Sequence, residues 1–176
     1  MKTEVKARKL VRNFELLDFD GDGFIEHADI RTFAERICDA GGVASNSHEG
    51  QKVIEQADKL WRALQQSMDS DGDQQVSRQE FIESANSSSV LTQAIQLGVL
   101  TFDVIDKDGD GRISRDEWTR LDQKLGIAQA DSRKGFDQLD KDNDGYLTRA
   151  EFNKGVEEFY RSQDPAAPGN MTFGKF

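Results

Sequence analysis

The feature that most constrains this chain is a 12-residue acidic segment that occurs four times. The copies read DFDGDGFIEHAD, DSDGDQQVSRQE, DKDGDGRISRDE and DKDNDGYLTRAE, and they occupy residues 18–29, 69–80, 106–117 and 140–151. Every copy has Asp at positions 1, 3 and 5, an aliphatic residue at position 8 and an acidic residue at position 12. A solvated Asp-rich turn accounts for one copy. It does not account for four copies in register.

Apolar residues flank these segments at helical spacing. Phe14, Phe102 and Phe136 stand four residues before the first, third and fourth segments, and a large apolar residue directly follows every segment. Apolar residues three and four positions apart indicate helix faces. The second segment departs from the pattern because Gln65 replaces the Phe. The repeated unit is therefore a helix, an acidic loop and a second helix, which predicts an all-α fold.

The charge pattern favours a cationic ligand. The chain has a formal net charge of −10, and the four loops hold more than half of its acidic residues. Clustered like charges repel one another unless a counter-charge is present, and this acidity also argues against nucleic acid as a partner. The loops have no Cys or His cluster, which argues against zinc or copper.

Each loop has the donor pattern of a calcium site. Calcium takes about six to eight oxygen ligands, and side chains at positions 1, 3, 5 and 12 with a backbone carbonyl at position 7 can supply them. The predicted ligands are Asp18, Asp20, Asp22, Phe24 and Asp29 in the first loop, Asp106, Asp108, Asp110, Arg112 and Glu117 in the third, and Asp140, Asp142, Asp144, Tyr146 and Glu151 in the fourth.

The second loop has every side-chain ligand but lacks one glycine. Position 6 needs a positive φ, which Gly tolerates and which costs another residue about 1–2 kcal/mol. This position is Gly in the other three loops and Gln74 here. We therefore expect three strong sites and a second site that is vacant or the weakest. Its predicted ligands are Asp69, Asp71, Asp73, Gln75 and Glu80.

The first loop differs at its last position. Asp29 is one methylene shorter than Glu, so we expect it to offer one oxygen to the ion and to favour a six-coordinate site that also suits magnesium. Glu26, at position 9, is a candidate to compensate directly or through water. We expect this site to discriminate less against magnesium than the third. We interpret His27 and His48 as ordinary surface residues rather than ligands.

At this point the chain resembles the EF-hand superfamily over nearly its whole length. The long interval between the first two loops contains GGVASNSHEG and a predicted helix at about 49–68, and the chain ends in DPAAPGNMTFGKF. These features and Asp29 resemble the sarcoplasmic calcium-binding proteins and bacterial calerythrin. The resemblance implies four EF-hands in one compact unit and a calcium and magnesium buffer or transporter.

Position 8 predicts how the hands pair. Each loop presents one extended residue there, and two such residues can bridge as a small antiparallel sheet. We expect Ile25 to meet Val76, and Ile113 to meet Leu147. This pairing predicts an N-terminal lobe at 1–88, a C-terminal lobe at 89–160 and a tail at 161–176. We expect Met171, Phe173 and Phe176 in this tail to pack on the lobes.

Three functions remain open at this stage. The first is the buffer or transporter. The second is a calcium sensor that exposes apolar surface and regulates a protein target, although sensors of that kind have Met-rich grooves and this chain has three Met. The third is a calcium-regulated protein that holds an organic ligand in its core, as the related photoproteins do. We expect no enzyme, because two His and one Cys offer no nucleophile–base pattern.

The remaining sequence features favour a monomer in the cytoplasm. The single cysteine, Cys38, excludes an internal disulfide and suits a reducing compartment. The charged N-terminal segment has no signal-peptide core. We found no apolar run near the roughly 20 residues that span a bilayer, and we therefore expect no membrane association.

Overall fold

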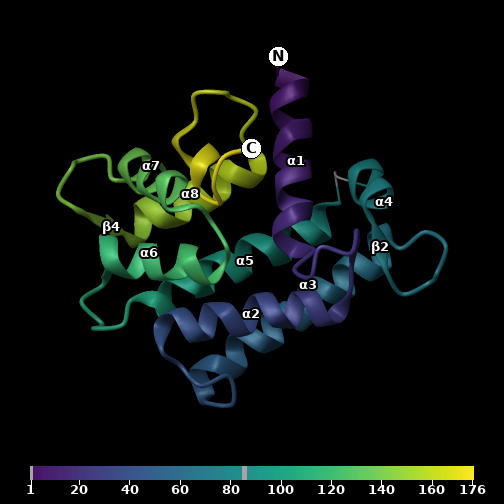
Figure 1. Cartoon of the computed structure of the whole chain (residues 1–176), viewed down its shortest axis with the longest axis horizontal. Coiled ribbons are helices and arrows are strands. Elements are labelled where there is room, and N and C mark those ends of the chain that lie inside the picture. The colour runs from purple at the N-terminus through teal and green to yellow at the C-terminus, as the bar shows by residue number, and fades with distance from the viewer. Residues whose placement is uncertain (1, 85–86) are drawn as a thin grey trace.

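The computed structural model describes residues 2–84 and 87–176, and this part of the chain is mainly helical, as Figure 1 shows. Its short strands lie where the acidic loops enter the following helices. In chain order the elements are α1 (Lys2–Leu17), β1 (Phe24–Ile25), α2 (His27–Gly41), α3 (His48–Met68), β2 (Val76–Ser77), α4 (Arg78–Glu83), α5 (Ser88–Ile105), β3 (Arg112–Ser114), α6 (Arg115–Lys124), α7 (Gln129–Leu139), β4 (Tyr146–Thr148), α8 (Arg149–Arg161) and the short 3₁₀ helix η1 (Pro168–Met171).

The strand register confirms the predicted pairing of the hands. β1 and β2 pair antiparallel with Ile25 opposite Val76, and β3 and β4 pair antiparallel with Ile113 opposite Leu147. All four residues are completely buried. The bridges therefore anchor the loops in pairs and also contribute side chains to the core.

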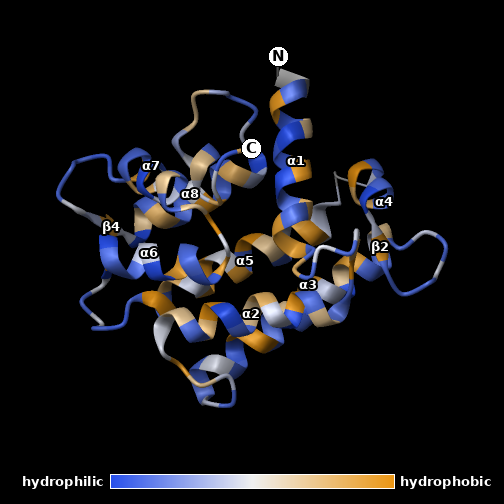
Figure 2. Cartoon of the chain, viewed as in Figure 1, coloured by the Kyte–Doolittle hydropathy of each residue, from blue (hydrophilic) through white to orange (hydrophobic). Residues whose placement is uncertain are grey.

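One hydrophobic core runs through both halves of the chain. It includes Phe14 and Phe81 from the first pair of hands, and Phe102, Trp118 and Phe152 from the second. Phe14 meets Phe81 edge to face at 5.6 Å between ring centroids, and Phe102 meets Phe152 in the same way at 5.5 Å. Figure 2 shows the corresponding pattern along the chain, with orange residues on the helices and mainly blue loops.

The two pairs of hands share an extensive helical interface. α5 packs on α3 and α2 from the first pair and on α8 from the second, while α2 also packs on α6. Because each half covers apolar helix faces of the other, the four hands form one compact unit. The exact lobe boundaries that the sequence suggested stay a prediction.

Helix α5 is more apolar than the sequence analysis recognised. In the described part of the chain it is the one helix that could cross a membrane by length and composition alone. The structure gives a physical reason for this composition, because α5 lies centrally between α2, α3 and α8. Its buried side chains include Val90, Leu97, Phe102 and Ile105.

The C-terminal tail lies against α7 and α8. Asn170 and Thr172 are buried, and the Phe173 ring meets that of Phe159 at a centroid distance of 4.8 Å. The side chain of Arg12 on α1 donates through Nε to the Phe173 carbonyl at 2.9 Å. The tail thus connects the first and last helices of the chain.

Candidate metal sites

Hydrogen bonds from successive backbone N–H groups to the aspartates shape all four loops in the same way. The carboxylate at position 1 accepts from the N–H at position 6 at 3.0–3.1 Å, the one at position 3 accepts from position 5, and the one at position 5 accepts from position 7. These bonds involve Asp18, Asp20 and Asp22; Asp69, Asp71 and Asp73; Asp106, Asp108 and Asp110; and Asp140, Asp142 and Asp144. Each loop therefore curls around its own carboxylates.

A positive φ at position 6 makes this curl possible. The angle is +96° at Gly23, +83° at Gly111 and +87° at Gly145, and Gln74 in the second loop has +69°. Gln74 also donates its N–H to Asp69 Oδ2 at 3.1 Å, as the glycines do to their own position 1. The second loop thus adopts the common shape despite the side chain that disfavours it.

The carboxylate at position 12 ties the two ends of each loop together. It accepts from the backbone N–H at position 2 and from the N–H at position 9, which immediately precedes the exit helix. The accepting residues are Asp29, Glu80, Glu117 and Glu151, and the main bonds range from 2.8 to 3.2 Å. In the last three loops, Ser or Thr at position 9 also forms a capping box with this Glu.

These contacts set the pKa of the closing carboxyl groups. Backbone and hydroxyl donors from Ser70 and Ser77 lower the pKa of Glu80 to about 2. Burial raises the pKa of Glu117 and Glu151, but hydrogen bonds outweigh it and leave both pKa values below their usual range. Asp29 differs, because its burial outweighs its hydrogen bonds and raises its pKa.

The loops differ in which carboxylates come closest together. In the first and second loops, the three aspartates at positions 1, 3 and 5 each place an oxygen within 4.8 Å of the others. In the third and fourth loops, this group consists of positions 1, 3 and 12 instead, which are Asp106, Asp108 and Glu117, and Asp140, Asp142 and Glu151. The position-7 residues Phe24, Arg112 and Tyr146 begin β1, β3 and β4, and Gln75 directly precedes β2.

The donor set fits a hard divalent cation. It consists of carboxylate oxygens with backbone carbonyls nearby, which is the chemistry that calcium prefers. Asp18 gives a specific indication of a bound cation, because its Oδ1 is buried without a hydrogen-bond partner. A buried oxygen without a partner is unfavourable, and a cation within the loop would satisfy it.

Position 10 carries a connection between hands that the sequence analysis missed. Arg115 in the third hand contacts Asp137 at 2.7 Å and covers the Phe136 ring on the entering helix of the fourth hand. In the fourth hand, Arg149 makes the equivalent contacts with Asp103 and the Phe102 ring of the third hand. A comparison of position 10 with the residue after each flanking Phe would have indicated these pairs.

In the first hand, the residue at position 10 of the loop is His27. Its Nε2 lies 2.7 Å from Asp58 Oδ1, and its ring stacks on Trp61 at 6.0 Å between centroids. His27 is exposed and does not join the first loop's carboxylates, as expected, and its contacts connect the first hand to α3. Glu26, the candidate to compensate at position 9 of the first loop, accepts a hydrogen bond on its carboxylate from the Gln75 side chain of the second loop. That contact points Glu26 toward the neighbouring hand.

The family comparison agrees with this geometry. The family model described as "EF-hand domain pair" matches residues 8–85 and 96–157. The chain belongs to the EF-hand family. The four acidic loops are accordingly EF-hand loops, and the two strand bridges join them as EF-hand pairs. A comparison with curated protein sequences finds no relative.

Several solved EF-hand structures share the whole fold. A calcium-binding protein of Streptomyces coelicolor is 27% identical, with 88% of this chain and 97% of that chain covered and a TM-score of 0.76. The amphioxus sarcoplasmic calcium-binding protein is 16% identical, with 98% of both chains covered and a TM-score of 0.73. The coelenterazine-binding protein of Renilla muelleri is 22% identical, with 99% and 98% covered and a TM-score of 0.71. For the last two proteins the sequence identity is low, so the similarity shows a shared fold only.

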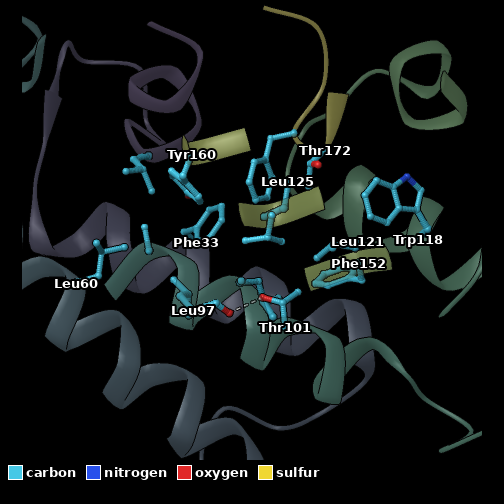
Figure 3. Close-up of a pocket in the computed structure, with 16 residues that line it drawn as sticks. Phe33, Leu60, Leu97, Thr101, Trp118, Leu121, Leu125, Phe152, Tyr160 and Thr172 are labelled. Carbon is cyan, nitrogen blue, oxygen red and sulfur yellow. Dashed lines mark hydrogen bonds between the residues drawn. The ribbon is translucent and has the colours of Figure 1, made fainter. Parts of the chain in front are cut away.

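The centre of this EF-hand protein is nearly solid. Figure 3 shows its central cavity between residues such as Phe33, Leu97, Leu121 and Tyr160, and its volume is about 20 Å³. A cavity of this size has room for about one water molecule. Three of the polar side chains that line it have partners within the protein: Thr101 donates to the Leu97 carbonyl, Thr172 to the Gly169 carbonyl and Trp118 to the Ser132 carbonyl. This interior therefore offers little to an organic ligand.

Proposed function

We propose that this EF-hand protein is a cytosolic calcium and magnesium buffer or transporter. The observation that carries the proposal is the combination of four preshaped acidic loops with a filled core. The loops supply oxygen donors for divalent cations, while the central cavity of the core has a volume of only about 20 Å³. Phe24 and Ile82 are the exposed large apolar side chains in the described part of the chain.

The proposed ligands are the residues that the repeat predicts. Positions 1, 3, 5 and 12 supply carboxylates and position 7 supplies its carbonyl in the first, third and fourth loops. The second loop has the same donors, but the strain at Gln74 makes it the weakest site. A bound ion supplies positive charge that offsets the repulsion among these carboxylates. The protein's own hydrogen bonds keep the loop closed around them.

The first site is proposed to discriminate least against magnesium. Asp29 keeps its backbone partners at both ends of the loop, and its side chain is one methylene shorter than the Glu that closes the other three loops. A closing carboxylate that reaches less far suits the smaller, six-coordinate ion. Calcium calorimetry with and without millimolar magnesium tests this assignment, and equal selectivity of the first and third sites would contradict it.

A calcium sensor is the second candidate function. The Streptomyces coelicolor protein is described by its "prokaryotic calcium-mediated regulation", and its similarity extends across most of this chain. A sensor would expose apolar surface and bind a protein target when calcium arrives. In this chain the buried apolar positions are mainly Phe, Leu, Ile and Trp, which favour fixed packing over an adaptable Met-rich surface.

Dye binding and calorimetry together separate the two functions. A buffer shows tight calcium binding with little change in the fluorescence of a dye that reports exposed apolar surface. A sensor shows a large increase in that fluorescence on calcium addition. Size-exclusion chromatography with light scattering on the same samples tests the expected monomer.

A further inference from the structure

A second concave site lies outside the EF-hand loops, between α1, the start of α5 and the C-terminal end of α8. We call it the α1–α8 groove and define it by Lys9, Leu10, Asn13, Leu91, Phe159 and Tyr160. Its volume is about 300 Å³, at the lower end of the range for small-molecule pockets in proteins. It is therefore much roomier than the central cavity.

Lys9 brings a nearly buried positive charge to this groove. The residue is only 5% exposed, and its Nζ donates to the carbonyls of Glu158 and Ser162 at 3.0 and 2.9 Å. These bonds use two of its three N–H groups. Burial lowers the pKa of Lys9 to about 8, against the opposing influence of Glu158. In the described part of the chain, no carboxylate forms an ion pair with Lys9 within 4.0 Å.

Nearby carboxylates have other partners. Glu158 accepts from the Gly169 N–H at 2.9 Å and lies 3.9 Å from the Lys154 ammonium. Glu157 pairs with Arg161 at 3.6 Å on the rim of the groove. An anionic ligand would therefore supply a counter-charge that the protein does not place directly on Lys9.

Asn13 provides an independent indication of a ligand. It is only 7% exposed, it lines the groove, and its Oδ1 is buried with no hydrogen-bond partner. Buried polar atoms nearly always have a partner. Asn13 follows Lys9 by four residues on α1, so the two side chains share one helix face. This oxygen has almost no exposed surface, so the Asn13 amide must turn toward the groove for an N–H or O–H group of a ligand to satisfy it while the ligand's anionic end lies near Lys9.

The remaining walls are partly apolar and partly polar, because Lys6, Arg161, Ser162 and Gln163 also line the groove. Leu10 and Leu91 contribute aliphatic surface, while Phe159 and Tyr160 contribute aromatic rings at 5.3 Å from each other in an edge-to-face arrangement. Aromatic rings prefer such offset or edge-to-face contacts. We propose that the α1–α8 groove binds a small aromatic carboxylate with one N–H or O–H donor, its carboxylate at Lys9 and its donor at Asn13.

Three probes test the parts of this proposal on the calcium-loaded full chain. Indole-3-acetate has the carboxylate, the aromatic body and an N–H group. Indole-3-acetamide lacks the charge, and 1-naphthylacetate lacks the N–H group. Calorimetry should give saturable 1:1 binding of indole-3-acetate, with each comparison probe about tenfold weaker because it loses one hydrogen-bonded contact. Equal affinity of all three probes, or no binding of indole-3-acetate, would overturn the proposal.

Amide chemical shifts and variants then locate the site. Indole-3-acetate should shift the signals of residues 9–13 and 159–163, whereas shifts centred on Thr101 and Leu121 would place it in the central cavity and overturn the assignment. Lys9→Met should abolish binding, while Lys134→Met, at an exposed lysine on α7, should leave it unchanged.

Because Lys9 also holds the end of α8, Asn13→Asp provides a second variant. It preserves the size of the side chain and places a carboxylate on the same helix face as Lys9, where it supplies the counter-charge that the ligand would otherwise supply. It should therefore weaken binding by at least about tenfold. A folded Asn13→Asp protein with unchanged affinity would contradict the proposal, even if Lys9→Met failed to fold. Calcium binding is measured separately, so failure of this site leaves the EF-hand assignment intact.

Discussion

Gln74 is the residue on which the strength of the second site depends. It holds the left-handed conformation with φ +69° that glycine holds in the other loops, at a cost of about 1–2 kcal/mol. Gln74→Gly removes that strain and should increase calcium affinity at the second site by up to about tenfold. Calorimetry measures the effect. Asn143→Gly, in the fourth loop, is the control, because Asn tolerates positive φ and its replacement should change affinity little.

The buried carboxyl group of Asp122 should make the stability of the folded protein depend on pH. It is 2% exposed on α6, and burial raises its pKa from 3.8 to about 7, against opposing effects from Ser132, Arg12 and Trp118. The folded protein therefore retains a proton that the unfolded chain loses between about pH 4 and pH 7, so stability falls as pH rises across this window.

Asp122→Asn removes this titration and should stabilise the protein more at pH 8 than at pH 5. Thermal unfolding of both proteins at several pH values measures the difference. Asp116→Asn, at an exposed position of the same helix, should show no comparable trend. A constant difference between wild type and Asp122→Asn over this pH range would show that Asp122 does not titrate as the structure indicates.

At the scale of elements, Gly98 sets how closely α5 approaches α8. A Cβ atom at this position would lie 2.6 Å from Cγ1 of Val156 on α8. In an open helix Gly→Ala gains about 1 kcal/mol, but overpacking costs about 1–3 kcal/mol. Gly98→Ala should therefore destabilise the protein, as measured by urea unfolding.

Val156 provides the control for this prediction, because a Cβ atom at Gly98 would meet its side chain. Val156→Ala removes the methyl groups that the new Cβ would meet, so Gly98→Ala should be better tolerated in that background. A double-mutant cycle measures this coupling. If Gly98→Ala stabilised the protein, the helices would have to separate more easily than their packing suggests.

At the scale of the whole molecule, the tail connects distant parts of the chain. Besides its contacts with α7 and α8, it offers the Phe173 carbonyl to Arg12 on α1. Removal of residues 165–176 deletes these contacts and uncovers the Phe159 ring. We expect a lower melting temperature and stronger binding of a dye that reports apolar surface.

Removal of Lys175 and Phe176 alone provides a matched control. This shorter truncation keeps Asn170, Thr172 and Phe173 and deletes the contacts of Phe176 with Arg8 and Lys9. Its effect should be clearly smaller. Equal melting temperatures of the full chain and the longer truncation would refute a stabilising role of the tail.

Local patterns predicted the loops well because their structure is largely local. Asp18 binds the N–H of Gly23 five residues later, and Glu117 reaches back ten residues to Lys107. A 12-residue repeat contains both partners of such bonds. The bridges Ile25–Val76 and Ile113–Leu147 followed as well, because equivalent extended residues recur in each loop.

Contacts between segments far apart in the chain were harder to predict from the sequence. Lys9 caps α8 through the carbonyls of Glu158 and Ser162, 149 and 153 residues away. His27 contacts Asp58 and Trp61 on α3, and Glu26 contacts Gln75 across the first strand bridge. No pattern within one loop specifies these partners, because they depend on how complete helices pack.

The sequence by itself determined the helix–loop–helix repeat, the order of the acidic donors and the one strained position, since hydrogen bonds within a dozen residues are encoded locally. Tertiary structure decided that α5 is the central helix, that the core is filled and that α1 meets the end of α8. The physical reason is that close packing depends on the shapes of surfaces that come together only when the chain has folded.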